Sequence, residues 1–133
     1  MDWCKSLSRE FGIGDNVIFK GYQSDVDSYM REATALLVAS PSEGFGRMTA
    51  EAAFCGCLVI GYDAAGTREV LNETGGFLWS SDDEYYDSME KVAAMDPDDY
   101  MRKALDAQKV AVRLYSTESY VGNVFSVYEK ALG

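Results

Sequence analysis

The chain has 133 residues, enough for one domain with a buried hydrophobic core. Its formal net charge is −10 and it contains no histidine, which argues against nucleic acid or an anionic membrane as a partner, because both need a basic face. No signal peptide is recognisable and no apolar run is long enough to span a bilayer, which predicts a soluble, cytoplasmic protein without a transmembrane segment.

The N-terminal elements are predicted from apolar spacing and turn residues. Residues 2–11 read as a short helix with Trp3 on its apolar face, and we expect this ring in the core. Residues 17–19 are predicted to form a strand. A helix follows, capped by Ser24 with Asp27 three residues on.

The central elements alternate between strand and helix. Residues 35–39 are a continuous apolar run, as expected of a parallel strand covered on both faces. After a turn that contains Glu43, a helix is expected with Met48 and Ala52 in its buried stripe. Residues 58–61 are the next predicted strand.

The last predicted strand, residues 76–79, follows a short helix at residues 67–71. From residue 81 onward the pattern is helical. Three helices are expected to begin near Asp82, at Asp96 with proline in the first position, and at Ser116. Aromatic residues of this region are expected to pack between helices: Tyr115, Tyr120, Phe125 and Tyr128.

This alternation predicts an α/β fold with a parallel, doubly wound, Rossmann-like sheet of about four strands, followed by C-terminal helices. Residues 1–133 are read as a single domain. Ligands of such sheets bind beyond the carboxyl ends of the strands. The turns at Gly21, Ser42, Asp63 and Gly66 are all expected at that edge.

The cysteines do not indicate a metal or a disulfide framework. Cys4, Cys55 and Cys57 cannot all pair, and the Cys55-x-Cys57 spacing differs from that of zinc or redox motifs. We expect reduced, buried thiols. Paired aspartates at the helix starts are explained by capping, so no metal site is predicted.

The stretch 42–51, S-E-G-F-G-R-M-T-A-E, predicts a site for an anion. Gly44 and Gly46 allow the backbone to approach a ligand, and the first amides of the following helix have no intrahelical partner. Glu43 and Glu51 would flank these amides with carboxylates, which suits a nucleotide sugar. The alternative is that Glu51 forms only a solvated helix ion pair with Arg47.

Glu43 and Glu51 also resemble the E-x7-E signature of the retaining glycosyltransferases of family 4, in the C-terminal donor-binding domain of a GT-B fold. The resemblance begins at residues 16–21, continues through residues 35–42, 51–56, 58–62 and 66–71, and fades after residue 78. About half of the chain is covered, with the blocks in family order. The resemblance implies that the chain is a partial nucleotide-sugar-binding domain.

The resemblance implies a role for each residue of the motif. Glu43 would be the catalytic residue and would bind hydroxyls of the donor sugar, while Glu51 would accept the ribose hydroxyls. Gly21 and Tyr22 would lie near the base. The alternatives are a packing role for the Tyr22 ring and glycines that only form turns. The remaining donor-binding positions, which would face sugar and phosphates with their backbone, are Gly44, Phe45, Gly46, Arg47, Met48 and Thr49.

The same resemblance implies a UDP-, GDP- or ADP-sugar as donor substrate and no cofactor or metal. The earlier strands, the basic pair for the diphosphate and the N-terminal acceptor domain of the family do not occur in this sequence. We therefore expect the isolated chain to be inactive, since transfer requires both domains. Exposed sheet edges favour a homodimer. The family also allows the full-length protein to lie peripherally at the inner membrane face.

Two other readings remain open. The chain could retain the GT-B-like fold as a non-catalytic binding or assembly module that acts with a partner subunit. It could also derive from a nucleotide-sugar 2-epimerase, although such an enzyme needs active-site histidines and this chain has none. Nucleotide binding that depends on Glu51 would distinguish the transferase reading from the assembly module.

Overall fold

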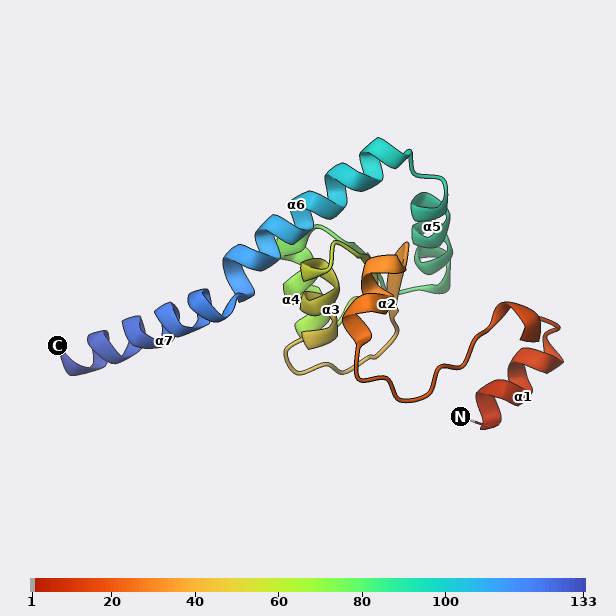
Figure 1. Cartoon of the computed structure of the whole chain (residues 1–133), viewed down its shortest axis with the longest axis horizontal. Helices are drawn as coiled ribbons and strands as arrows, with labels where there is room; N and C mark the ends of the chain where they lie inside the picture. The colour runs from red at the N-terminus through yellow and green to blue at the C-terminus, as the bar shows by residue number, and fades with distance from the viewer. Residues whose placement is uncertain (1) are drawn as a thin grey trace.

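The computed structural model describes residues 2–133, which form helices around a small sheet (Figure 1). In chain order the elements are α1 (Asp2–Glu10), the 3-10 helix η1 (Gly14–Asn16), α2 (Val26–Glu32), β1 (Ala35–Val38), α3 (Arg47–Phe54), β2 (Leu58–Tyr62), α4 (Ala65–Thr74), β3 (Phe77–Trp79), α5 (Asp82–Ala93), α6 (Pro97–Tyr115) and α7 (Thr117–Leu132).

The sheet is parallel and has the order β1-β2-β3, with Leu36 paired to Val59 and Ile60 paired to Phe77. The predicted α/β class with a parallel sheet is therefore confirmed. The prediction of about four strands was wrong, because residues 17–19 form no strand and Ile18 is 75% exposed. Their apolar and β-branched side chains favour extended backbone, but a strand also needs a neighbouring edge to pair with.

Helices cover both faces of the sheet, and β2 forms its centre. Val59 lies in a cluster with Met30, Ala52 and Leu71, on the face covered by α2, α3 and α4. Ile60 lies beside residues of α5 on the opposite face. Because both faces are covered, successive residues of β2 are all buried, with Leu58, Val59 and Ile60 at most 2% exposed.

Strand β1 is less well covered than predicted. Leu37 is 42% exposed, although Val38, on the other face, is 3% exposed. A hollow of about 440 Å³ lies beside Leu37, Ile60 and the α5 residues Met89 and Val92. The expectation that β1 is covered on both faces was therefore wrong for its α5 side.

Helix α6 begins as predicted and lies across the outer faces of α3 and α4. The Asp96 carboxylate accepts a hydrogen bond from Asp98 N at 2.9 Å, and proline stands in the first turn. Alanines at the helical spacing of residues 104, 107 and 111 are buried and permit close approach. Gln108 Nε2 donates to the carbonyl of Phe54 at 2.6 Å, which satisfies a carbonyl at the end of α3.

The terminal helices α1 and α7 project away from the sheet (Figure 1). Trp3 is 73% exposed, so its predicted place in the core was wrong. Helix α7 buries none of its residues. The predicted packing was also wrong for its aromatic residues, which are 63–68% exposed: Tyr120, Phe125 and Tyr128. Among residues 2–133, no helix is long and apolar enough to cross a membrane.

The cysteines are free thiols, of which Cys57 is buried and Cys4 exposed. The expectation of buried thiols was therefore wrong for Cys4. Burial raises the pKa of the Cys57 thiol and so favours its neutral form.

Candidate functional site

The turn between β1 and α3, residues 39–46, leads directly into the start of a helix. Gly46 is the residue before α3 and has φ +76° and ψ +41°, a left-handed conformation that suits glycine. It offers no side chain to cap the helix. Within residues 2–133, no side chain therefore caps the first amides of α3, which have no partner inside the helix.

Residues on both sides of Gly46 are exposed, although Gly46 itself is buried against Gly66. Phe45 is 55% exposed and Met48 is 47% exposed, so the predicted burial of Met48 was wrong. Gly44 is also exposed. Thr49 is fully buried instead, and its Oγ1 has no hydrogen-bond partner among residues 2–133. Thr49 is thus enclosed in the interior, and the contact of its backbone with a ligand stays a prediction.

Glu43 lies in this turn, three residues before Gly46, and is half-buried. Its backbone carbonyl accepts a hydrogen bond from Gly66 N at 3.0 Å. Within residues 2–133, its carboxylate takes part in no hydrogen bond or ion pair of the structure. The main chain of Glu43 is thus anchored, while its side-chain oxygens can accept bonds from a ligand.

Glu51 lies on α3, four residues after Arg47. Arg47 Nη2 and Glu51 Oε1 are 3.4 Å apart, and the two side chains are 82% and 44% exposed. An ion pair with this exposure contributes about 0–1 kcal/mol, so it presents little barrier to a ligand. The helical rise places Glu51 about 6 Å along the axis from Arg47, close below the open start of α3.

The α2 side of Glu51 contains a hollow of about 340 Å³, which Asp27, Arg31, Phe54 and Cys55 also line. Glu51 therefore borders a space between α2 and α3 that is open to solvent. Arg31 belongs to a long ion pair with Asp27, with 4.0 Å between Arg31 Nη2 and Asp27 Oδ2. Burial is the main cause of the raised pKa of the Cys55 thiol, which keeps this neighbour neutral.

Gly21 and Tyr22 lie outside the sheet, in the segment that precedes α2. Gly21 has φ +67°, and Tyr22 is 93% exposed, so the alternative of a packing ring was wrong. Sequence reasoning missed Gln23, whose Nε2 donates to Lys20 O at 2.7 Å and to Tyr22 O at 2.9 Å. Tyr29 Oη donates to Gln23 Oε1 at 3.1 Å, which ties this turn to α2.

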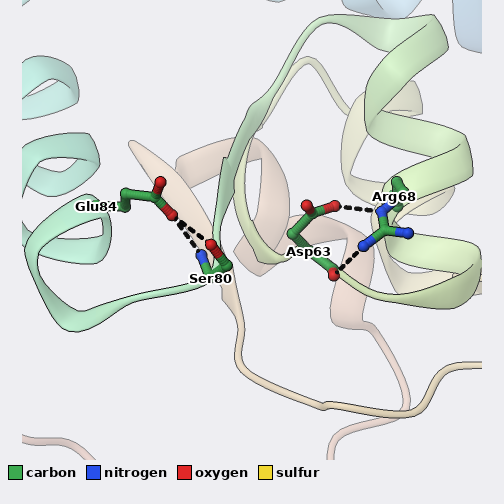
Figure 2. A network of polar contacts seen from close by, with 4 residues as sticks. All are labelled: Asp63, Arg68, Ser80 and Glu84. Atoms are coloured by element: carbon green, nitrogen blue, oxygen red, sulfur yellow. Dashed lines mark hydrogen bonds and ion pairs between the residues drawn. The ribbon is translucent and has the colours of Figure 1, made fainter.

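A second turn, residues 63–66, joins β2 to α4 (Figure 2). The sequence analysis placed Asp63 at this edge but did not predict its contact with Arg68 of α4. Arg68 Nε donates to Asp63 Oδ1 at 2.5 Å, and Arg68 Nη2 donates to Asp63 O at 2.7 Å. These contacts with Asp63 raise the pKa of Arg68. An acidic residue directly after a strand and an arginine in the first turn of the next helix was the available signal.

The edge as a whole combines amide donors with carboxylate acceptors. The start of α3 supplies backbone amides without a side-chain cap, and Glu43 and Glu51 supply carboxylate oxygens. Arg47 supplies a local positive charge in a protein whose formal net charge is −10. Among residues 2–133, no group of histidine, cysteine, aspartate and glutamate side chains is arranged to hold a metal ion. The arrangement can bind an anion together with hydroxyl groups.

Comparisons with known proteins show the family to which the chain is similar. The family described as "Glycosyl transferases group 1" matches residues 1–109, which include every predicted site residue. An uncharacterised glycosyltransferase of Methanocaldococcus jannaschii is 31% identical over 107 residues, which are 80% of this chain and 30% of the relative. The match thus spans less than a third of that relative's length.

Proposed function

Because the chain belongs to the group 1 glycosyl transferases, we propose that it carries the nucleotide-sugar-binding part of a retaining glycosyltransferase of family 4. The observation that carries this proposal is the start of α3, which has Gly46 at its cap and no side-chain cap, with Glu43 before it and Glu51 along it. In the full protein, a sugar is transferred from a UDP-, GDP- or ADP-sugar to a glycan or lipid acceptor.

Each part of this edge has a chemical role in the proposal. The amides of residues 45–49 face the sugar and the diphosphate, for which a helix N-terminus is suited. Glu43 binds hydroxyls of the donor sugar, and Glu51 accepts the two ribose hydroxyls. Gly21 and Tyr22 contact the base. The transfer breaks the bond between the anomeric carbon and the diphosphate oxygen, and the acceptor oxygen forms a bond to the same face of that carbon. The proton of the acceptor hydroxyl passes to the leaving diphosphate.

Arg47 has a double role in this arrangement. It lies in the first turn of α3, where a cation opposes the helix dipole but can partner a diphosphate. When the donor binds, the weak ion pair between Arg47 and Glu51 is replaced by contacts of Arg47 with the diphosphate and of Glu51 with the ribose. No metal or cofactor enters the proposal.

A binding experiment tests this function. Isothermal titration of the chain with UDP-, GDP- and ADP-glucose should show binding of one nucleotide class, and Glu51→Ala should weaken it by about tenfold or more, the loss expected for hydrogen bonds to a charged acceptor. Glu129→Ala, on exposed α7, is the matched control and should bind as wild type. Equal affinity of the two variants would refute the proposed role of Glu51.

We propose that transfer of the sugar requires further parts of the full protein in addition to residues 1–133. The match covers 30% of the relative, and an acceptor-binding N-terminal domain would orient the acceptor against the donor. We therefore expect the isolated chain to form no radiolabelled glycoside when it is incubated with an acceptor and a labelled nucleotide sugar. Measurable turnover by the purified chain would contradict this expectation. In the full protein we place the domain in the cytoplasm or peripherally at the inner membrane face.

Helix α7 favours a second candidate function, that of a binding or assembly module acting with a partner. Its exposed residues include Val121, Phe125, Tyr128 and Leu132, and such an apolar surface commonly marks an interface. The open edge of β1 is another surface for self-association, so a homodimer is part of this candidate. Sedimentation as a monomer at high concentration would count against the dimer, and nucleotide binding that depends on Glu51 would favour the transferase.

A further inference from the structure

The β1–α3 turn and the β2–α4 turn, at the carboxyl edge of the sheet, are in main-chain contact at Gly46 and Gly66. A Cβ atom added to Gly66 would lie 2.6 Å from Gly46 N and 2.7 Å from Phe45 O, and one added to Gly46 would lie 2.7 Å from Gly66 O. Real Cβ atoms do not approach backbone this closely. Both positions therefore require glycine, and the main chain of the β1–α3 turn rests directly on that of the β2–α4 turn.

A hydrogen bond fixes the register of this contact. Gly66 N donates to the carbonyl of Glu43 at 3.0 Å. The bond thus holds the main chain of Glu43, whose carboxylate has no partner among residues 2–133. The donor, Gly66, lies in the first turn of α4. Any shift of Gly66 is consequently transmitted to the main chain of Glu43.

The β2–α4 turn is itself firmly held. Asp63 N donates to Trp79 O at 2.8 Å, which ties the turn to β3. Arg68 spans the turn with its two bonds to Asp63 (Figure 2). Ala65 has φ +41°, the positive φ of a non-glycine residue, and a residue keeps such a strained conformation only where its surroundings enforce it.

We propose that the β2–α4 turn, held by Asp63 and Arg68, is a positioning element that sets the place of Glu43 at the sugar end of the donor. This inference rests on the proposed function and deepens it, because it assigns a task to residues that contact no ligand. Arg68 acts through Asp63, and Gly66 acts through the carbonyl of Glu43, so both are positioning residues.

The proposal makes a distinction that a general loss of stability would not produce. Glu43 contacts the sugar, whereas Glu51 and the amides of α3 contact the nucleotide. A displaced Glu43 therefore weakens binding of the nucleotide sugar and leaves binding of the bare nucleoside diphosphate unchanged. The ratio of the two dissociation constants is the quantity that reports positioning.

The test uses Arg68→Met, which removes the bonds to Asp63 and keeps the aliphatic stem. Its control is Arg102→Met on α6, which removes another exposed arginine whose Nη2 lies 2.6 Å from Asp99 Oδ1. We expect Arg68→Met to weaken nucleotide-sugar binding by about tenfold, the value of a hydrogen bond to a charged group, with less than a twofold change for the diphosphate. Arg102→Met should change neither constant, and Arg68→Lys should fall between.

A second pair of variants tests the glycine contact. Gly66→Ala should weaken binding of both ligands, because its Cβ would displace the main chain of Phe45 and Gly46, which is proposed to face the diphosphate. Gly122→Ala on α7, where an added Cβ meets no atom within 4 Å, should bind as wild type. Equal weakening of both ligands by Arg68→Met, or no weakening of either, would overturn the positioning role.

Amide hydrogen exchange separates this inference from the proposed function. In wild type the Gly66 amide should be protected by its bond to Glu43 O, and Arg68→Met should reduce that protection while Arg102→Met does not. If wild type bound no nucleotide or nucleotide sugar, the proposed function would fail and with it the ligand-directed part of the inference. Unchanged exchange at Gly66 in Arg68→Met would independently overturn the part that concerns Glu43.

Discussion

The body of the molecule, β1–β3 with α2–α6, differs sharply from its two terminal helices, α1 and α7. In the body, Leu58, Val70 and Ala111 are at most 1% exposed, whereas in the terminal helices Trp3 is 73% and Phe125 is 64% exposed. Both regions contain apolar residues at helical or strand spacing. The difference shows that spacing determines which face is apolar, while burial requires a second surface to pack against.

Apart from Gly21 and Tyr22, which precede α2, the candidate site belongs to the body. The β1–α3 turn, α3 and the β2–α4 turn supply its residues, and each of these elements packs on β2 or on a helix that does. The terminal helices supply exposed apolar side chains instead. We therefore expect changes in the body to alter stability and ligand binding, and changes in α1 or α7 to alter association.

The largest expected effect tests the comparison directly with one substitution made in each region. Leu58→Ala, at a side chain that is 1% exposed, should lower the free energy of unfolding by about 3 kcal/mol. Leu132→Ala, at a side chain that is 88% exposed, should change it by less than about 0.5 kcal/mol. Urea unfolding followed by circular dichroism measures both. Similar losses would mean that α7 packs against the body in solution.

A smaller effect concerns the boundary between the two regions. Tyr115, the last residue of α6, meets the Phe45 ring edge to face, with 5.8 Å between ring centroids and an interplanar angle of 90°. Tyr115 thus packs as predicted, but its aromatic partner lies in the β1–α3 turn and not in a helix. Tyr115→Leu should cost about 1 kcal/mol of stability, and Tyr120→Leu, on exposed α7, is its control. If both variants unfold alike, the end of α6 does not support the site turn.

The smallest effect is a pH-dependent one at the start of α5. Ser80 N and Ser80 Oγ each donate to Glu84 Oε2 at 2.7 Å (Figure 2), and these bonds lower the pKa of the Glu84 carboxyl. Because the pKa is lower in the folded state, this stabilisation is present above the unfolded value of about 4.3 and is lost as pH falls through the folded value.

Glu84→Gln should therefore lower the melting temperature slightly near neutral pH, and the difference from wild type should shrink as the pH falls below about 4. Differential scanning calorimetry over this pH range measures the effect. The exposed Glu118→Gln variant controls for the loss of a charge. A difference that stays constant with pH would show that Glu84 does not act through its ionised form.

Local sequence patterns predicted much of the body. The run at residues 58–61 was identified as a strand because all its positions are apolar, and Asp96-Pro97 located the start of α6. The strand predicted at residues 17–19 is absent, because strand propensity does not show whether a partner strand is available for pairing. Helix α4 runs from residue 65 to residue 74 and is therefore longer at both ends than the predicted 67–71.

The candidate site was predicted only as far as single motifs allow. The glycines and glutamates of residues 42–51 indicated an open helix start, and Gly46 has the backbone conformation that this requires. The contact between Gly66 and the Glu43 turn was not predictable, because it depends on the distance between two strands of the sheet. The same holds for the exposure of Met48, whose helical spacing matched that of the buried Ala52.

Chemical-shift mapping with a nucleotide sugar tests the central claim most directly. The ¹⁵N-labelled chain is titrated with the nucleotide sugar that binds best in calorimetry, and shifts are recorded for every assigned amide. The account predicts saturable shifts at residues 45–49 and at Glu51, with the amides of α1 and α7 unchanged. Shifts confined to α7, or saturable binding that leaves residues 45–49 unperturbed, would contradict it.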